Sequence, residues 1–138
     1  MSEHPQIDEV LDEFHAAAGS ADEDRYFATL SESMVFLGTA PGERWEGDAW
    51  RNFVHSYFSK GKGWTYMPSE RTVVLSDDAN IAWFDEEVAN EHFGACRGTG
   101  VLRQEQGNWR VVQYNLTIPV PDELAVELVA KIRTMRPA

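Results

Sequence analysis

The chain has 138 residues, a formal net charge of −11, 43% hydrophobic residues and 12% aromatic residues. This length is typical of a single domain, and the apolar content excludes general disorder. The acid excess argues against nucleic acid and anionic membranes as partners, because both are recognised by basic surfaces.

Cysteine content and hydropathy bear on the compartment. Cys96 is the only cysteine, so an internal disulfide is impossible, which suits a reducing cytoplasm. The first residues show no positive segment followed by an apolar run, and no stretch approaches the ~20 apolar residues of a membrane span. We therefore expect a cytoplasmic protein without a secretory signal.

The first third of the chain has the apolar spacing of helices. Apolar residues recur at i, i+3, i+4 and i+7 from Ile7 to Phe14, and Gly19 is a natural end for this helix. A shorter helix is expected within residues 20–30. The apolar run at 34–37 is too short for a surface helix and predicts a buried strand.

A third helix is expected after a loop at 39–47 that contains one proline and two glycines. Asp48 is its expected N-cap, and Lys60 with Gly61 ends it. One face of this helix carries an apolar stripe, mostly aromatic: Trp50, Phe53, Val54, Tyr57 and Phe58. Such a stripe is more typical of core packing than of a ligand platform.

From residue 64 the apolar period changes to two, which is typical of strands. Short turns separate four expected strands at 64–75, 81–89, 95–105 and 109–118. Short connections favour an antiparallel meander. After Pro119 and Pro121, a last helix is expected over 122–136. Helices mostly in the first half, followed by a meander, predict an α+β fold in one domain, 1–138, with its core at 7–121.

Several strings resemble the nuclear transport factor two-like superfamily and, within it, the SnoaL-like domain group. They lie at 36–39 (FLGT), 43–47 (ERWEG), 82–86 (AWFDE), 97–102 (RGTGVL), 109–114 (WRVVQY) and 118–121 (IPVP). The resemblance covers residues 7–121. It implies a ketosteroid isomerase-like cone, in which a curved antiparallel sheet wraps over the N-terminal helices and encloses a cavity. It does not specify an activity, because this fold hosts many functions.

One departure from the catalytic members concerns the last strand. Many relatives carry a His-x-Ser string there, whereas this chain has Tyr114-Asn115-Leu116-Thr117. Asn115 offers hydrogen bonds but no titratable base. The resemblance therefore gives weaker support to acid/base catalysis at this position.

Strand alternation, combined with the resemblance, assigns polar side chains to the concave face of the sheet. A one-residue slip in register would reverse this assignment. The expected concave residues are Trp83, Asp85, Arg97, Thr99, Gln113 and Asn115.

Asp85 is the candidate general base, because an apolar cavity would raise its pKa toward neutrality. Alternatively, Asp85 pairs with Arg97 across adjacent strands, or lies on the outer face. Arg97 is the candidate anchor for a ligand carboxylate, with a structural ion pair as its alternative. Trp45, Tyr26 and His15 are further candidates for the pocket, although each is also compatible with a core position. The histidine and cysteine spacing shows no metal site.

Two functions follow from these assignments. The first is a small-molecule pocket for an apolar or carboxylate-bearing ligand, with cofactor-free acid/base chemistry of the isomerase, dehydratase or cyclase type. The second is a non-catalytic dimeric binding or association module. An apolar row on the convex face predicts a homodimer through the sheet: Val112, Tyr114, Leu116 and Ile118.

Overall fold

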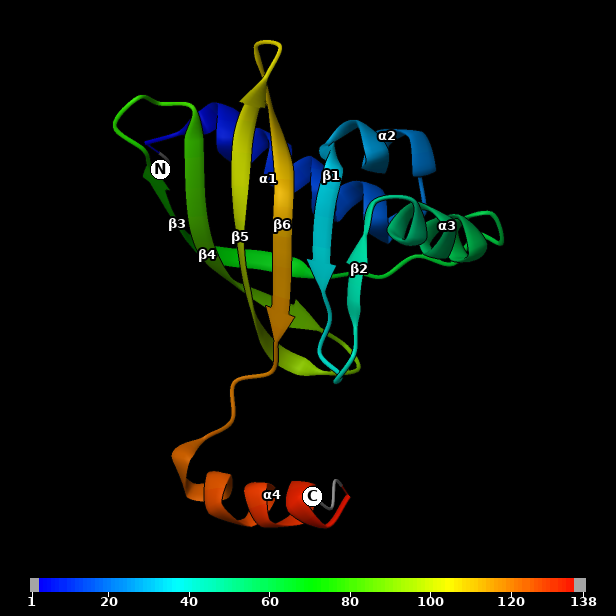
Figure 1. Cartoon of the computed structure of the whole chain (residues 1–138), viewed down its shortest axis with the longest axis vertical. Helices are drawn as coiled ribbons and strands as arrows, with labels where there is room; N and C mark the ends of the chain where they lie inside the picture. The colour runs from blue at the N-terminus through cyan, green and yellow to red at the C-terminus, as the bar shows by residue number, and fades with distance from the viewer. Residues whose placement is uncertain (1–2, 136–138) are drawn as a thin grey trace.

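In the computed structural model, which describes residues 3–135, six strands form one curved sheet in the order β2-β1-β6-β5-β4-β3 (Figure 1). Neighbouring strands are antiparallel, except that β1 and β6 are parallel. The strands are β1 (Leu30–Leu37), β2 (Arg44–Glu46), β3 (Met67–Leu75), β4 (Ile81–Asn90), β5 (Gly94–Glu105) and β6 (Asn108–Thr117).

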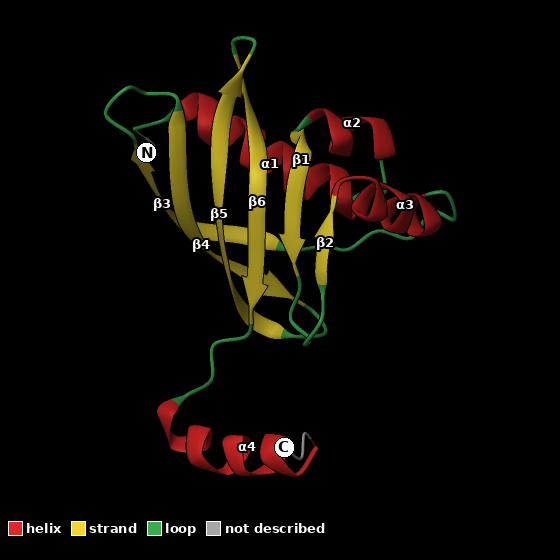
Figure 2. Cartoon of the chain, viewed as in Figure 1, coloured by secondary structure: helices red, strands yellow, loops and turns green. Residues whose placement is uncertain are grey.

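The helices are α1 (Pro5–Gly19), α2 (Glu23–Ala28), α3 (Gly47–Phe58) and α4 (Asp122–Met135). Figure 2 shows α1 crossing one face of the sheet, with α2 and α3 beside β1 and β2, and α4 standing apart beyond an extended linker. Within residues 3–135, no helix has the length and hydropathy that crossing a membrane requires.

The predicted α+β class is confirmed, and the differences are local. The expected loop at 39–47 contains β2, which pairs with β1 through Trp45 opposite Phe36. β1 begins at Leu30 instead of residue 34, and β3 begins at Met67 instead of residue 64. Residue 136, the expected end of the last helix, lies outside the described residues.

The face of the sheet that α1 covers contains the core. On β4 this inner face carries Ala82, Phe84, Glu86 and Val88, all of them buried. α1 directs Ile7, Leu11 and Phe14 into the same cluster. The inner face of β4 therefore carries the even-numbered residues, whereas the prediction placed the odd-numbered Trp83 and Asp85 there. One of the inward residues, Glu86, is acidic.

A β-bulge in β6 explains why alternation failed on that strand. Val101 is opposite Gln113, but Leu102 is opposite Val111, so Val112 is an extra residue in the ladder. A bulge changes which face the following side chains occupy. Val111 points inward before the bulge, and Tyr114 and Leu116 point inward after it.

Two glycines on the inner face of β5 make room for aromatic rings. A Cβ atom at Gly98 would lie 1.9 Å from the Tyr114 hydroxyl, and one at Gly100 would lie 2.9 Å from the Phe84 ring. β5 therefore passes close under both rings, which a larger residue at either position would prevent.

The prediction of a continuous apolar row on the convex face is wrong. Tyr114 and Leu116 are buried on the inner face, whereas Ile118 is exposed beyond the end of β6. The bulge at Val112 is the reason, because strict alternation had placed all four side chains together.

Candidate functional site

The predicted base and ligand anchor lie outside the core. Asp85 and Trp83 are exposed on the outer face of β4, where the Trp83 side chain is 47% accessible. Arg97 is exposed on the same face of β5. Asp85 is opposite Thr99 and Arg97 is opposite Glu87, and within the described residues no ion pair joins Asp85 to Arg97. Their concave placement is therefore wrong, as is their pairing, and the structure has the third alternative for Asp85, the outer face.

The remaining strand candidates share that outer face. Thr99, Gln113 and Asn115 are half-buried there, with Thr99 opposite Asn115 in the ladder. The β6 bulge reverses the face expected for Gln113 and Asn115. The candidate set thus forms a polar outer surface, and the expected concave placement is wrong for these residues too.

The inner face holds a buried acidic residue that sequence reasoning did not select. Glu86 on β4 is 1% exposed, and its carboxylate accepts three hydrogen bonds. His15 Nε2 lies 2.5 Å and the Tyr114 hydroxyl 2.9 Å from Oε2, while Arg71 Nε lies 2.8 Å from Oε1. We call Glu86, His15, Tyr114 and Arg71 the Glu86 cluster.

Electrostatics keep Glu86 ionised. Burial alone would raise the pKa of Glu86, but the hydrogen bond and charge of His15, together with Arg71, lower it below its usual value. Burial and the Glu86 carboxylate both raise the pKa of Tyr114, so its hydroxyl remains a donor. Arg71 also pairs with Asp8 and Asp12 on α1.

These contacts identify a structural role for the cluster. An ionised carboxylate that accepts three hydrogen bonds has little capacity left to take a proton from a substrate. Arg71 ties β3 to α1, and His15 ties α1 to β4. His15 therefore lies in the core against Glu86, where the sequence had allowed either a pocket or a core position.

A pocket of about 220 Å³ lies between α3, β1, β2 and the segment that follows α3. Seven of its eleven lining residues are aromatic. We call it the aromatic pocket, and it is lined by Phe36, Gly38, Thr39, Glu43, Trp45, Trp50, Phe53, Trp64, Tyr66, Phe93 and Leu116. The predicted candidate Trp45 lines it, whereas Tyr26 is fully buried in the core.

The rings of the aromatic pocket hold one another in place. Trp50 stacks on Phe36 with centroids 4.3 Å apart and planes 6° from parallel. Trp45 packs on Phe53 at 4.5 Å, and Trp50 lies 6.0 Å from Trp64. The stripe on α3 was predicted to be core, and two of its members, Trp50 and Phe53, also form a pocket wall.

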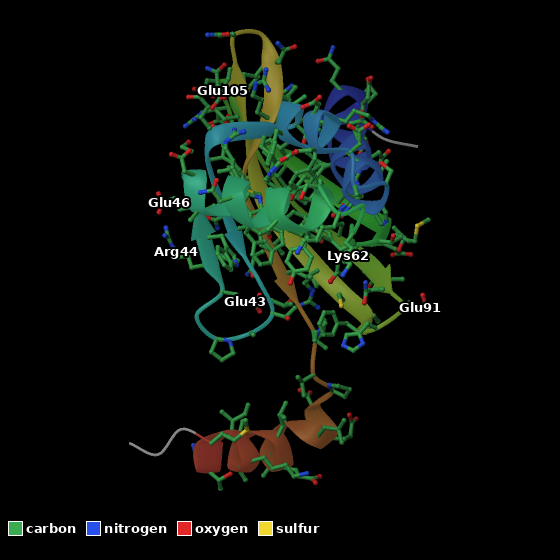
Figure 3. All side chains as sticks on the ribbon, turned by 90° about the vertical axis from the view of Figure 1, so that its right-hand side faces the viewer. Glu43, Arg44, Glu46, Lys62, Glu91 and Glu105 are labelled. Atoms are coloured by element: carbon green, nitrogen blue, oxygen red, sulfur yellow. The ribbon has the colours of Figure 1, made fainter. Side chains whose placement is uncertain are left out.

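Glu43 is the charged residue at this pocket. It lies in the loop between β1 and β2, at the end of the domain from which the linker to α4 leaves (Figure 3). Its Oε1 accepts the Ala40 N–H at 2.8 Å. A Cβ at Gly38 would lie 2.9 Å from Oε2, so glycine there lets the carboxylate fold against the end of β1.

Tyr66 provides a second polar group. Burial, together with Cys96 and Glu43, raises the pKa of Tyr66 to about 12, so its hydroxyl stays protonated at neutral pH. Among the described lining residues, none carries a lysine, arginine or histidine side chain. The pocket thus combines apolar walls, a carboxylate and a phenol.

Other hollows differ in their lining. A larger one, of about 610 Å³, lies beside the β5–β6 hairpin and is lined mostly by polar and charged side chains, including Arg51, Arg103 and Glu105. Ligand pockets are typically apolar with a few polar groups, which fits the aromatic pocket better. Within residues 3–135, no three His, Cys, Asp or Glu side chains are grouped to hold a metal ion.

Comparison with known proteins shows which family has this fold. A family model described as SnoaL-like domain matches residues 7–121, the same range as the predicted resemblance. A search of curated proteins gave no match.

Solved structures share the fold at low sequence identity. An NTF2-like protein of unknown function from Pseudomonas putida KT2440 has a TM-score of 0.69 and 16% identity, over 89% of this chain and 92% of that one. A protein with a cystatin-like fold from Nostoc punctiforme has 0.67 and 14%, over 85% and 91%. An NTF2-like protein with a cystatin-like fold from Novosphingobium aromaticivorans has 0.68 and 12%, over 92% and 88%. These similarities support the cone fold and assign no activity.

Proposed function

The chain belongs to the SnoaL-like domain family of the nuclear transport factor two-like superfamily, and we propose that it binds a small, mostly apolar molecule in the aromatic pocket. One observation carries this proposal: seven aromatic side chains converge on one hollow that also holds a carboxylate and a phenol. Such a lining is typical of small-molecule sites, where apolar walls supply affinity and a few polar groups fix orientation.

The size of the pocket limits the ligand. A volume of about 220 Å³ lies below the range typical of drug-sized sites. A ligand with one ring and a short substituent fits this space. Phe93, one of the lining residues, is 38% exposed, so the pocket wall reaches solvent at this residue.

Binding is better supported than isomerase, dehydratase or cyclase chemistry. Asp85, the expected base, is on the outer face, and Glu86 is held ionised by three donors away from the aromatic pocket. Cytoplasmic location stays a prediction, for which the single buried cysteine is the supporting observation.

Intrinsic fluorescence tests the proposal. Three of the five tryptophans, Trp45, Trp50 and Trp64, line the pocket, so titration with 2-phenylethanol, which does not absorb where tryptophan is excited, should change their emission saturably. Trp45→Ala should weaken binding by about tenfold, whereas Trp83→Ala, on the outer face, should leave it unchanged. The melting temperature of each variant separates lost binding from lost folding. A wild-type protein that shows no saturable change overturns the proposal.

A second candidate is association of two copies through α4. None of the residues of α4, all of which are described, is buried, and one face of the helix is apolar: Ala125, Leu128, Val129, Ile132 and Met135. Acidic residues occupy its first half, including Glu127, and Lys131 and Arg133 occupy its second half. Antiparallel pairing of two α4 helices covers the apolar faces and brings opposite charges together.

Light scattering of the full chain tests this association. Two paired helices of 14 residues bury little surface, so we expect a weak dimer, with dissociation in the micromolar range or above. Leu128→Glu should yield a monomer. Ala130→Glu, on the opposite face and exposed in the wild type, should remain dimeric. A monomeric wild type, or a dimer that Leu128→Glu does not disturb, contradicts the pairing.

A further inference from the structure

The charge of the aromatic pocket restricts its ligand further. Glu43 is the only residue with a charged side chain among the described lining residues, and the chain as a whole has a net charge of −11. A pocket with low-dielectric walls strengthens the field of the charges that line it. An anion entering this pocket would therefore meet a carboxylate and no compensating cation.

Glu43 has unused capacity for a hydrogen-bond donor. Within the described residues, its Oε1 accepts the Ala40 N–H and no ion pair involves this carboxylate. The neighbouring Glu46 is different, because it pairs with Arg44 at 2.8 Å. A half-buried carboxylate without a cationic partner is a suitable acceptor for an ammonium group, since a charged donor strengthens the bond.

The tryptophan rings in the walls of the aromatic pocket also favour a ligand with an ammonium group. Tryptophan rings bind cations through the negative charge at their faces, more strongly than tyrosine or phenylalanine rings do. Trp45, Trp50 and Trp64 all line the pocket, and mutual packing fixes their rings. Trp50 is 3% exposed and stacked on Phe36, so the half-buried Trp45 and Trp64 are the rings that a ligand can reach. Faces of this kind accept the CH groups next to an ammonium, and they also pack against an apolar ring.

We infer that the aromatic pocket selects a small organic cation, whose ammonium lies at Glu43 and whose apolar part lies against Trp45, Phe53 and Trp64. This inference rests on the proposed binding function and names its ligand class. It replaces the carboxylate-bearing ligand expected from Arg97, because that residue lies on the outer face.

Three probes of similar shape and different charge test the inference: phenethylamine, 2-phenylethanol and 3-phenylpropionate. Each is titrated into the full-length protein at neutral pH, and tryptophan emission is followed. We expect the amine to bind about tenfold more tightly than the alcohol, and the carboxylate to bind most weakly.

Two variants test whether Glu43 causes the tighter binding of the amine. Glu43→Gln keeps the shape of the side chain, so it should weaken amine binding about tenfold while leaving the alcohol unchanged. Glu46→Gln removes a nearby negative charge that already has a partner, and it should have little effect on either probe.

The outcomes separate the inference from the proposed function. Equal affinity for amine and alcohol, or equal weakening of both by Glu43→Gln, overturns the cation preference and leaves a binding pocket. Tighter binding of the carboxylate also overturns it. If all three probes fail to bind, both the inference and the proposed function are wrong.

Discussion

Glu86 and Glu43 are two carboxylates in one domain with different surroundings. Glu86 is buried and accepts hydrogen bonds from three side chains, which hold its charge inside the fold. Glu43 is half-buried beside aromatic rings, and its described contacts are a hydrogen bond to the Ala40 N–H and packing against Gly38. A carboxylate that is fully hydrogen-bonded stabilises the fold, whereas one with spare acceptor capacity beside a hollow can bind a ligand.

Removing the carboxylate of Glu86 should give the largest effect. Glu86→Ala leaves His15 and Tyr114 buried without their acceptor and removes one of the three carboxylates that Arg71 contacts. Losing one partner of a buried charge pair costs about 3–5 kcal/mol. We expect the free energy of unfolding, measured with urea, to fall by about this amount. Glu87→Ala, on the outer face of the same strand, is the control and should change it little. Equal effects of both substitutions would contradict the structural role of Glu86.

Acidification should weaken the same cluster by a smaller amount. The pKa of Glu86 is lower in the folded protein than in the unfolded chain, so its contribution is complete above the unfolded value of about 4.3. That contribution is lost as the pH falls through the folded pKa. The difference in unfolding free energy between wild type and Glu86→Gln should therefore narrow below pH ~4. A difference that stays constant down to pH ~3 would refute the lowered pKa.

Tyr114→Phe removes a single donor while the ring remains. The unfolding free energy should fall by about 1–2 kcal/mol, because Glu86 keeps its bonds to His15 and Arg71. Binding of 2-phenylethanol in the aromatic pocket should be unchanged, since Tyr114 does not line it. A large loss of binding with unchanged stability would show that the two regions are not separate.

Sequence patterns predicted every helix and strand except β2, but they did not predict which face of the sheet each side chain occupies. The apolar period predicted α1, α3 and the meander, because each of these buries one continuous face. The parallel pairing of β1 with β6 joins residues far apart in the chain, and no local pattern encodes it. The bulge at Val112 inserts one residue between two apolar stretches, so alternation alone could not place Gln113.

A signal for the correct face was nevertheless present. Ala82, Phe84 and Val88 have the same parity as Glu86, and Gly98 and Gly100 alternate on the next strand. Apolar residues beside alternating glycines favour a face covered by aromatic rings, which is what the structure has at Phe84 and Tyr114. No sequence pattern indicated the pocket at Glu43. Its lining comes from the loop between β1 and β2, from α3 and from β6, which are far apart in the chain.

The smallest expected effect concerns Asp85, the residue first selected as a base. Asp85→Asn changes an exposed side chain on the outer face of β4, opposite Thr99 and Thr72. Because no buried partner loses a contact, the unfolding free energy should change by less than about 0.5 kcal/mol. The affinities for phenethylamine and 2-phenylethanol should match those of wild type. A loss of binding comparable to that of Glu43→Gln would mean that the outer face also serves the ligand, and the contrast between the two carboxylates would no longer define the site.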